Sequence, residues 1–565
     1  MVIQFNDKKE QKALEELRKK EEEDLIQMIA ESRYGVPPIN LGPVPIENDA
    51  LRTVTKDNAE EEKIAPFKLL GKNIHVAVHS PQQNRLERLH KYFVKRGLIP
   101  HFYMASTASL EKAWKRYEEI SYASESKTGN IDVSAEMLAI LQEKINSIAD
   151  VKKEVEEIMN DKTHVTSHIL EAVIAGAIAI NASDIHFEPE KDAVRLRYRL
   201  DGVLQEIMDI SPKIHKFLNS RIKILSGVKI STTSTAQDGR FSIFLDENEI
   251  NMRVSLIPGT YGESIVMRIL NPKSIRVKLN ETGVSDKLYK IFLREIKKPN
   301  GLILLTGPTG SGKTTTLYSF LQKIYSTELK IITIEDPVEY HLDGIIQTQT
   351  NEEKGYTFLE GLRSVLRQDP DIIMVGEIRD KETAKIAVES SLTGHMVFST
   401  LHTNNAAGVI PRLINLGINA KTLVSALSLA IAQRLVRKLC PHCKKEYELN
   451  EEEKKIINKI TEKAKSDGKD LTEYGVDLNN YKTYKAEGCE KCNMTGYKGR
   501  LGIFEAIHND KSIEKIIPNN PGEREIKEVA AKQGILNMKE DGIVKILTGI
   551  TSFDEVKSVV DFYEE

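Results

Sequence analysis

The chain has 565 residues, of which 40% are hydrophobic and 29% are charged, and its formal net charge at pH 7 is −3. A single hydrophobic core does not grow to this size, so we expect three or four domains. The near-neutral charge argues against a globally basic nucleic-acid-binding surface, and no apolar run reaches the ~18 residues of a membrane-spanning helix. The N-terminus lacks the basic flank and apolar run of a signal peptide, so we expect a cytoplasmic chain that meets a membrane only through partners.

Lys and Glu dominate the beginning of the chain. Residues 1–25 carry them together with leucines at helical spacing, which predicts a charged, weakly amphipathic helix that is either solvated or docked on a partner. Residues 26–119 alternate short apolar runs with helical patterns and predict a small α/β domain. Its expected elements are a strand at 74–78, a helix at 86–97, a strand at 101–105 and a helix capped by Ser106 or Thr107.

A linker and a second α/β domain are expected next. Residues 120–162 begin with Ser, Gly and Asn and end in a charged helical stretch, a composition typical of a linker. Residues 163–275 predict the second domain, with a hairpin that turns at Asp201-Gly202. Three arginines share one strand face of this hairpin, which forms either a solvated edge or a contact with nucleotide or a neighbouring subunit. They are Arg195, Arg197 and Arg199.

Residues 276–565 repeat a pattern of strand, helix and strand, which predicts a doubly wound parallel sheet. The expected strands are short apolar runs at 302–305, 331–334, 372–375 and 396–399. Asp380 is the expected N-cap of a helix that ends at Gly394. The predicted fold class is therefore multidomain α/β, with a parallel-sheet core preceded by two small α/β domains.

A phosphate-binding loop, Gly307-Pro308-Thr309-Gly310-Ser311-Gly312-Lys313-Thr314, lies between an expected strand and an expected helix. Its glycines let successive backbone N–H groups point at a phosphate, and the helix adds its positive N-terminal end. Lys313 would reach the β/γ-phosphate oxygens, and the Thr314 hydroxyl would ligate Mg²⁺. The loop therefore predicts ATP and Mg²⁺ as ligands.

Two acidic segments follow other strands of the same sheet. Glu335 and Glu339 come at the carboxyl edge, where ligands bind in this fold, and a carboxylate there can orient or deprotonate the attacking water. Glu377 follows an apolar strand, which is the pattern of the second Mg²⁺-coordinating element, although most phosphate-loop ATPases carry Asp there. The alternative is that these are ordinary surface acids at the start of loops.

Two histidines, His395 and His402, flank the expected strand at 396–399. A single histidine at a strand edge is usually structural. Two imidazoles that bracket a strand beside the γ-phosphate position predict a sensor of the hydrolysis state.

The four cysteines form two CxxC pairs in one quarter of the chain, Cys440 with Cys443 and Cys489 with Cys492. In a reducing compartment this spacing favours a metal over disulfides. Four thiolates suit a structural, tetrahedral Zn²⁺ and leave no open position for catalysis. We expect the zinc module at about residues 438–505, with thiol redox chemistry as the alternative.

Several of these segments closely resemble the secretion and pilus-assembly ATPase superfamily, and within it the type IV pilus extension and type II secretion motors. The Walker A, Asp box, Walker B and His box of that family correspond, in order, to segments within 307–318, 335–340, 367–380 and 399–404. Residues 182–189 and 237–240 resemble the family's second N-terminal domain, and the cysteines resemble its zinc module. Retraction motors generally lack both the first N-terminal domain and the cysteines, so the resemblance favours assembly over disassembly.

The resemblance implies a RecA-like core in a homohexameric ring, with ATP between the second N-terminal domain and the core. It implies that hydrolysis turns an inner-membrane platform protein and adds pilin or pseudopilin subunits to a filament, at the inner face of the cytoplasmic membrane. Glu339 is the favoured general base and Glu335 the second choice. Nucleotide contacts are implied for the loop through Thr315 and for five arginines, whose action within one subunit or on a neighbour stays open. These arginines are Arg253, Arg268, Arg363, Arg367 and Arg379.

Two other function classes compete with this interpretation. A hexameric nucleic-acid translocase with a zinc ribbon is opposed by the near-neutral charge and the few aromatic residues near the loop. A nucleotide-gated scaffold without turnover is opposed by the presence of Glu339 and Glu377. The first N-terminal domain also lacks the arginine-leucine-glycine pattern of the cyclic-di-GMP-binding subgroup, so regulation by that dinucleotide is not expected.

Overall fold

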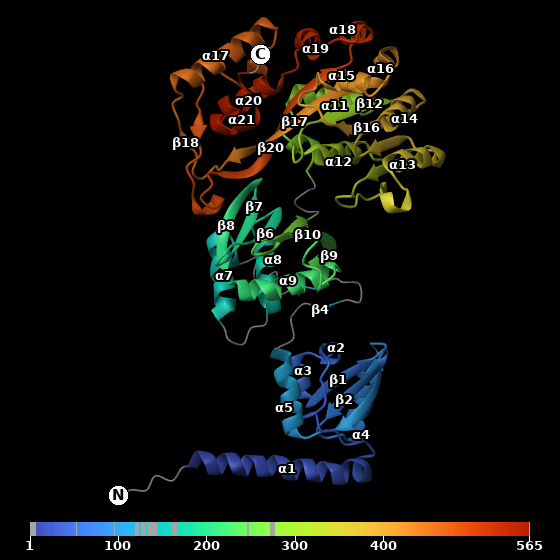
Figure 1. The fold of residues 1–565 in the computed structure, drawn as a ribbon, viewed down its shortest axis with the longest axis vertical. Coiled ribbons are helices and arrows are strands. Elements are labelled where there is room, and N and C mark those ends of the chain that lie inside the picture. The colour runs from blue at the N-terminus through green and yellow to red at the C-terminus, as the bar shows by residue number, and fades with distance from the viewer. Residues whose placement is uncertain are drawn as a thin grey trace.

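The computed structural model describes residues 7–51, 53–94, 96–118, 124–125, 131–132, 144–160, 166–245, 248–271, 277–478 and 480–563. In chain order these residues form an N-terminal helix and three α/β units, of which the C-terminal unit is the largest (Figure 1). Within these ranges, no helix is both long enough and apolar enough to cross a membrane.

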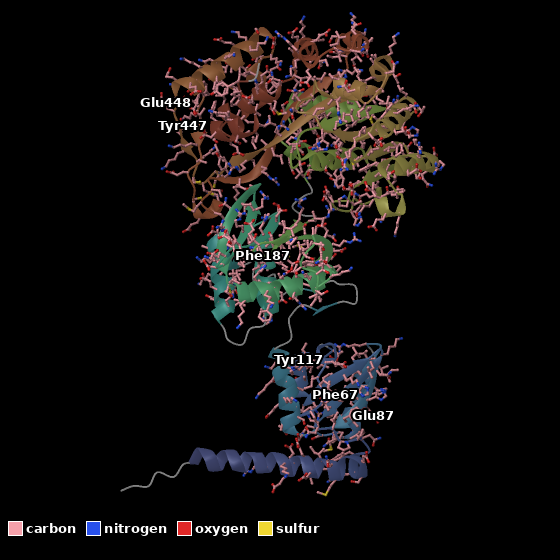
Figure 2. All side chains as sticks on the ribbon, viewed as in Figure 1. Phe67, Glu87, Tyr117, Phe187, Tyr447 and Glu448 are labelled. Carbon is pink, nitrogen blue, oxygen red and sulfur yellow. The ribbon has the colours of Figure 1, made fainter. Side chains whose placement is uncertain are left out.

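The N-terminal unit is built on a three-stranded sheet of order β1-β2-β3, with β1 antiparallel and β3 parallel to β2. Phe67 packs with Leu110 on one face of this sheet (Figure 2), and Val76 packs with Phe93 on the other. Apolar side chains therefore fill both faces. The elements are α1 (Asp7–Tyr34), α2 (Asn48–Leu51), α3 (Lys56–Glu61), β1 (Ile64–Leu70), β2 (Asn73–Val78), α4 (Gln83–Val94), β3 (Ile99–Met104), α5 (Thr107–Lys115) and η1 (Arg116–Glu118).

The predicted elements of this unit are confirmed to within a few residues, and Ser106 caps α5 by accepting the N–H of Ser109 at 3.2 Å. The charged helix at the start of the chain is longer than predicted, because its second half is apolar on one side. Ile26 and Ala30 of α1 are buried against this unit, and Glu22 accepts the backbone N–H of Thr107 at 3.0 Å.

The second unit is an antiparallel sheet of order β4-β5-β9-β10-β11-β6-β7-β8, in which only the short β5 pairs in parallel. Three helices cover one face, and Phe187 lies buried between them and the sheet (Figures 1 and 2). One of these helices, α7, falls within the range predicted as a linker, and its Val151 and Val155 belong to the core of this unit. The elements are β4 (Ser124–Glu125), β5 (Ile131–Asp132), α7 (Ile148–Asn160), α8 (Thr166–Ala179), β6 (Asp184–Pro189), β7 (Val194–Leu200), β8 (Val203–Ile210), α9 (Pro212–Ser226), β9 (Gln237–Leu245), β10 (Asn248–Gly259) and β11 (Gly262–Leu270).

The face of this sheet that carries no helix is polar. Arg195, Arg197 and Arg199 lie on it, and each pairs with an acid of the same unit. Arg195 pairs with Glu190 at 2.5 Å, and Arg197 pairs with Glu188 at the same distance. The stripe of arginines on β7 is therefore engaged within its own sheet.

The C-terminal unit contains a seven-stranded sheet of order β14-β13-β15-β16-β12-β17-β20, parallel except for β20. Two separate apolar clusters fill its two faces, as in a doubly wound sheet. The four predicted strands are confirmed, and Asp380 caps α14 by accepting the N–H of Thr383 at 2.8 Å. The elements through the sheet are η2 (Leu279–Glu281), α11 (Asp286–Glu295), β12 (Gly301–Thr306), α12 (Lys313–Ile324), β13 (Ile331–Glu335), β14 (Ile346–Gln349), η3 (Glu352–Lys354), α13 (Phe358–Val365), η4 (Leu366–Gln368), β15 (Ile372–Val375), α14 (Lys381–Leu392), β16 (Met396–Leu401), α15 (Val409–Asn415), α16 (Ala420–Ala426) and β17 (Leu427–Leu439).

The cysteine-bearing segment is inserted between β17 and β20. A buried ion pair joins it to the C-terminal helices, because Lys469 Nζ lies 2.7 Å from Glu540 Oε2. The elements of this part are β18 (Lys445–Glu446), α17 (Glu451–Ser466), η5 (Leu471–Tyr474), β19 (Tyr484–Lys485), η6 (Glu490–Cys492), β20 (Tyr497–His508), α18 (Lys511–Ile516), η7 (Ile517–Asn519), α19 (Glu523–Ala530), η8 (Ala531–Gln533), α20 (Met538–Leu547) and α21 (Phe553–Val559).

Hydrogen bonds from two backbone N–H groups link the second unit to the cysteine-bearing segment and to the start of β20, which follows it. The backbone N–H of Gly499 donates to Asp201 Oδ2 at 2.8 Å, at the tip of the β7–β8 hairpin. The backbone N–H of Ile148 donates to Asn493 Oδ1 at 2.8 Å, at the start of α7. Asn493 directly follows Cys492, so this contact lies beside the cysteines.

A buried carboxylate, Glu295, ends α11 and predicts an acid-sensitive stability. Burial alone would raise its pKa, but hydrogen bonds with His508, Lys298 and Arg294 lower the pKa from 4.5 to about 2. A group whose pKa is lowered on folding stabilises the fold above its unfolded pKa, and this contribution disappears as the pH falls through the folded pKa. It amounts here to about 3 kcal/mol, lost between about pH 4.5 and 2.

We therefore expect Glu295→Gln to lower the free energy of unfolding at pH 7 and to flatten its fall on the acid side. Denaturant unfolding between pH 7 and 3 measures both effects. The exposed Glu328→Gln is the matched control and should follow the wild-type curve. If the pH dependence of the free energy of unfolding of Glu295→Gln ran parallel to that of the wild type, Glu295 would not be the source of the acid sensitivity.

Candidate functional site: a nucleotide site and a tetracysteine cluster

The phosphate-binding loop connects the end of β12 with the first residue of α12, as the sequence predicts. Gly307, Gly310 and Gly312 all have positive φ angles, of 144°, 79° and 87°. Residues with a side chain rarely adopt these angles. A Cβ at Gly307 would also meet the carbonyl oxygen of Gln433 at 2.5 Å. Backbone conformation and close packing therefore both require glycine here.

Gln433 supports the loop from the neighbouring strand β17, and sequence reasoning missed this role. It is buried, and its Oε1 accepts the hydroxyl of Thr316 in α12 at 2.8 Å. Its Nε2 would lie 2.9 Å from a Cβ at Gly312. The available signal was a lone amide directly after the apolar run from Leu429 to Ala432. Buried amides need hydrogen-bond partners, and a nearby glycine-rich loop supplies them.

Lys313 folds back into the curve of the loop. Its Nζ donates to the carbonyl oxygens of Gly307 at 2.7 Å and Pro308 at 3.0 Å, and burial lowers its pKa. The hydroxyl of Ser311 is buried and has no hydrogen-bond partner in the described structure. Thr314 and Thr315 lie in the first turn of α12. An ammonium, an orphaned hydroxyl and a helix N-terminus fit a phosphate chain.

Glu377 lies next to the loop at the carboxyl edge of the sheet. Its Oε2 is 3.0 Å from His402 Nε2, and its Oε1 pairs with the guanidinium of Arg379. Burial alone would raise the pKa of Glu377, but hydrogen bonds from His402 and Arg379 lower it below its usual value. The carboxylate is therefore charged at neutral pH and held in place from two sides.

The two candidate general bases, Glu335 and Glu339, differ in their surroundings. Glu335 is buried at the end of β13 and accepts hydrogen bonds from Tyr318, Thr333 and, at 3.1 Å, Gln347. Burial raises its pKa. The side chain of Glu339 is about one-third exposed, and its Oε2 lies 3.3 Å from Arg253 Nη1.

Arg253 comes from β10 of the second unit, so it bridges the two units at the site. Its Nη2 also donates to the carbonyl oxygen of Val338 at 2.9 Å. Arg268 is its direct cross-strand neighbour on β11. Arg363 and Arg367 have a different environment. Arg363 pairs with Glu360 at 2.7 Å and Arg367 donates to the carbonyl oxygen of Arg363, so α13 engages both.

The structure does not bring His395 to this site. His395 precedes β16, and its carbonyl accepts the N–H of Gly301 at the start of β12. His402 follows the other end of β16, beside the end of β12. In a parallel sheet these are opposite edges, so the prediction that both imidazoles lie beside the γ-phosphate is corrected for His395.

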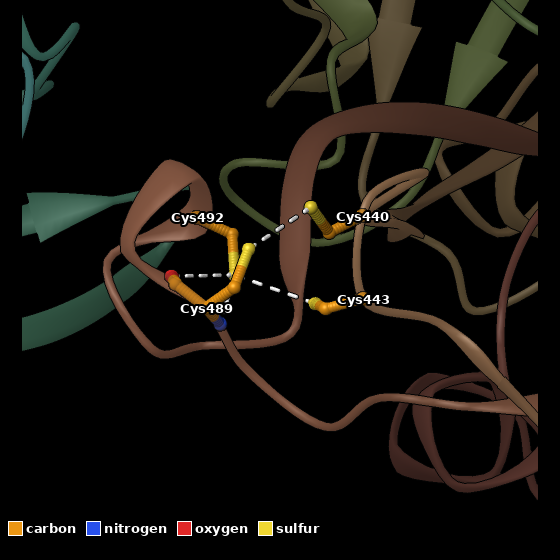
Figure 3. A group of neighbouring side chains, drawn as sticks. All are labelled: Cys440, Cys443, Cys489 and Cys492. Carbon is orange, nitrogen blue, oxygen red and sulfur yellow. Dashed lines mark hydrogen bonds between the residues drawn. The ribbon is translucent and has the colours of Figure 1, made fainter.

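The four cysteines converge on one point (Figure 3). The Sγ–Sγ distances are 3.9 Å for Cys440–Cys489, 3.7 Å for Cys443–Cys492 and 3.7 Å for Cys489–Cys492. All four sulfurs lie within 4.8 Å of one another. Four thiolates about 2.3 Å from a central ion would lie about 3.8 Å apart, so the cluster fits a tetrahedral metal site.

Backbone groups favour the thiolate form of one member of this cluster, Cys492. The Sγ of Cys492 accepts the N–H groups of Cys489 at 3.2 Å and Gly496 at 3.3 Å. Burial alone would raise the pKa of Cys492, but these donors lower it to about 7. Metal ligation requires deprotonated cysteine, so the surrounding backbone is suited to a bound cation.

Comparison with known proteins agrees with this geometry. Residues 159–558 match the family described as type II/IV secretion system protein, and residues 34–123 match the family described as MshEN domain. The type II secretion system ATPase E of Vibrio cholerae is 43% identical over 391 residues, which cover 69% of this chain and 74% of the relative.

The type IV pilus assembly ATPase PilB of Myxococcus xanthus is 35% identical over 541 residues, which cover 95% of this chain and 91% of the relative. Among solved structures, the Legionella pneumophila ATPase DotB has a TM-score of 0.51 at 21% identity and covers 71% of this chain and 98% of its own. That similarity supports the RecA-like fold. The chain therefore belongs to the type II/IV secretion system protein family, and it is an ATPase.

Proposed function

We propose that this chain is the hexameric motor of a filament-assembly machine, which hydrolyses ATP to drive a platform protein at the inner face of the cytoplasmic membrane. The observation that carries the proposal is one sheet edge that brings together the phosphate loop, the Glu377–His402 pair and an arginine from the second unit. Such a site closes when the two units approach, and domain closure is the usual source of mechanical work in nucleotide motors.

Type IV pilus assembly is the favoured process. The pilus assembly relative from M. xanthus aligns over 95% of this chain, including the N-terminal unit, whereas the secretion relative from V. cholerae aligns over 69%. The additional aligned region contains the MshEN domain at residues 34–123. Type II secretion, with pseudopilin subunits in place of pilins, is the second candidate.

Each residue of the site has a role in this proposal. Lys313 neutralises the β- and γ-phosphates, while Thr314 and Glu377 hold Mg²⁺, which supplies charge neutralisation on the phosphate oxygens. Glu339 is the general base, because a partly exposed carboxylate can accept a proton from water. Glu335 is already occupied by three donors and orders the start of the Asp box instead. His402 is the sensor of the hydrolysis state, because it contacts Glu377 directly.

Four of the five arginines form two groups that meet a phosphate chain, and the fifth, Arg379, acts on Glu377. Arg253 and Arg268 meet the triphosphate from the second unit, and Arg379 orders Glu377. Arg363 lies on the exposed side of α13 and Arg367 is exposed in the following η4, and we assign both to a nucleotide bound by a neighbouring subunit of the ring. Guanidinium groups suit both tasks, because they stay charged and form paired hydrogen bonds with phosphate oxygens.

The tetracysteine cluster is proposed to hold a structural Zn²⁺ ion. Zinc prefers four thiolates in tetrahedral geometry, and no ligand position is left for water or substrate. The ion would fix the segment around Asn493 and Gly499, which contacts the second unit.

The test of the motor is ATP hydrolysis by the full chain together with its assembly state and membrane partner. We expect phosphate release with Mg²⁺, a hexamer by light scattering, and co-purification of a polytopic inner-membrane protein of a pilus operon. Lys313→Ala should abolish hydrolysis. A steep salt-dependent stimulation by DNA, without a membrane partner, would instead support the translocase alternative.

A further inference from the structure

A row of charged side chains crosses the helix-free face of the sheet in the second unit. Strand register places five residues side by side, one from each of five neighbouring strands β9, β10, β11, β6 and β7. They are, in spatial order, Arg240, Arg253, Arg268, Asp184 and Arg199. Four arginines therefore lie in one line with a single carboxylate among them.

Asp184 holds the two arginines on either side of it. Its Oδ1 accepts the Nε–H of Arg268 at 3.0 Å, and its Oδ2 lies 3.4 Å from Arg199 Nε. The hydroxyl of Ser183 donates to the same Oδ2 at 2.8 Å. Asp184 is 5% exposed, whereas the side chain of Arg268 is 60% exposed. The carboxylate is thus buried and fixed, and the arginine that it holds reaches out from the sheet.

The atom of Arg268 that Asp184 binds is informative. Because the carboxylate takes the Nε–H and the side chain is largely exposed, N–H groups on the terminal nitrogens of the guanidinium remain available to an anion. The neighbouring residue in the row, Arg253, already contacts Val338 and Glu339 of the ATPase core. Directly opposed residues on adjacent strands have Cβ atoms about 5 Å apart, so Arg268 lies one strand spacing from the nucleotide site.

Positioning of this kind has a clear physical need. Like charges in adjacent cross-strand positions repel, and a long arginine side chain has many rotamers to lose when it binds. A single buried carboxylate offsets part of the repulsion and removes the rotamer freedom before ATP arrives. Binding energy is then available for the triphosphate rather than for ordering the side chain.

We propose that Asp184 is a positioning residue of the nucleotide site, which orients Arg268 toward the γ-phosphate without touching the nucleotide itself. The inference rests on the proposed function of the site. It adds to the site a residue to which neither the sequence motifs nor the geometry of the core gives a role. Its charge excludes direct contact with a polyphosphate, so its effect on catalysis passes through Arg268.

The same sheet offers a matched control. Glu188 also lies on β6, on the same face as Asp184, and pairs with Arg197 of β7 at 2.5 Å. This acid–arginine pair has the same chemistry and shares strand β6, but its arginine lies on β7 rather than β11, and the pair lies outside the row. A role that is only structural would make Asp184→Asn and Glu188→Gln equivalent.

The experiment compares steady-state ATP hydrolysis and equilibrium nucleotide binding of full-length variants. Asp184→Asn keeps the size of the side chain and should lower kcat/KM for ATP about tenfold, the order expected for one charge-assisted hydrogen bond. It should weaken binding of a non-hydrolysable ATP analogue more than binding of ADP, because ADP lacks the γ-phosphate. Glu188→Gln should stay within twofold of the wild type in both measurements.

A double-mutant cycle isolates the route through Arg268. In an Arg268→Ala background, Asp184→Asn should have no further effect on kcat/KM, and Asp184→Glu should restore most of the activity lost in Asp184→Asn. Additive losses, an equal loss for ATP analogue and ADP, or equal behaviour of Asp184→Asn and Glu188→Gln would overturn the inference. An inactive wild-type chain would refute the proposed function instead, and an active wild type with a fully active Asp184→Asn would refute only the positioning role.

If Asp184→Asn lowers the thermal midpoint strongly, the cycle is run at a temperature where circular dichroism shows all variants folded. The ATP-to-ADP affinity ratio then remains decisive, since partial unfolding lowers both affinities alike.

Discussion

Glu377→Gln is expected to reduce kcat for ATP hydrolysis by at least 100-fold while ATP still binds. The substitution keeps the shape and hydrogen-bonding oxygen of the side chain but removes its charge. In the folded chain that charge is stabilised by His402 and Arg379, which keep the pKa of Glu377 low. Removing one preorganised electrostatic group from a site that stabilises developing charge typically costs about 10² to 10³ in rate.

The measurement separates chemistry from binding. Phosphate release under saturating ATP gives kcat, and fluorescence titration with a labelled ATP analogue gives the affinity, which should change by less than tenfold. Glu389→Gln, on the exposed side of α14, removes an exposed carboxylate that pairs with Lys385 on the same helix. It should leave both quantities unchanged. A Glu377→Gln enzyme with wild-type kcat would remove Glu377 from the catalytic assignment.

Loss of the metal is expected to have the second largest effect. Metal analysis of protein purified without chelator should give one zinc per chain, and Cys492→Ser should abolish it. Structural zinc sites contribute about 10 kcal/mol or more of apparent binding free energy in small domains. Here the C-terminal helices pack on the same segment, so we expect local unfolding of the module and a lower thermal midpoint rather than loss of the whole fold.

Hydrogen exchange gives the diagnostic signal. The amides of Ile148 and Gly499 donate across the boundary between the second unit and the C-terminal unit. Their protection should fall in Cys492→Ser and after chelation. Lys491→Ala, in the same turn between Cys489 and Cys492, serves as the control and should retain zinc and protection. A metal-free wild type with full stability would reject the structural role.

Four strands of the core sheet could be predicted because each is a short, mostly apolar run between turn residues. These four strands are buried on both faces, so a continuous apolar run predicts each of them without an alternation of apolar and polar residues. They are β12, β13, β15 and β16. Asp380 was predictable for a different reason, since a short acid before an apolar helical pattern is a cap.

The orientation of single side chains in the site could not be predicted in the same way. Glu335 and Glu339 are four residues apart around the end of β13, and only the packing of Tyr318 and Gln347 decides that Glu335 turns inward. Gln433 was missed because its partner, the phosphate loop, is more than a hundred residues away in the chain.

The separation of His395 from the phosphate site follows from the length of β16 alone. A strand of six residues spans about 20 Å, so residues at its two ends cannot share one phosphate.

Strand β17 joins two features that are otherwise separate in function. Gln433 supports the phosphate loop, and seven residues later Cys440 begins the tetracysteine cluster, so the chain covers about 23 Å between them. It is paired along this length with β20, so the two strands form a stiff two-stranded ribbon. A tilt of about 10° at the nucleotide end would displace the far end by about 4 Å. A small rearrangement around the phosphate loop would thus move the cysteine end of β17, at the boundary with the second unit, by several ångströms.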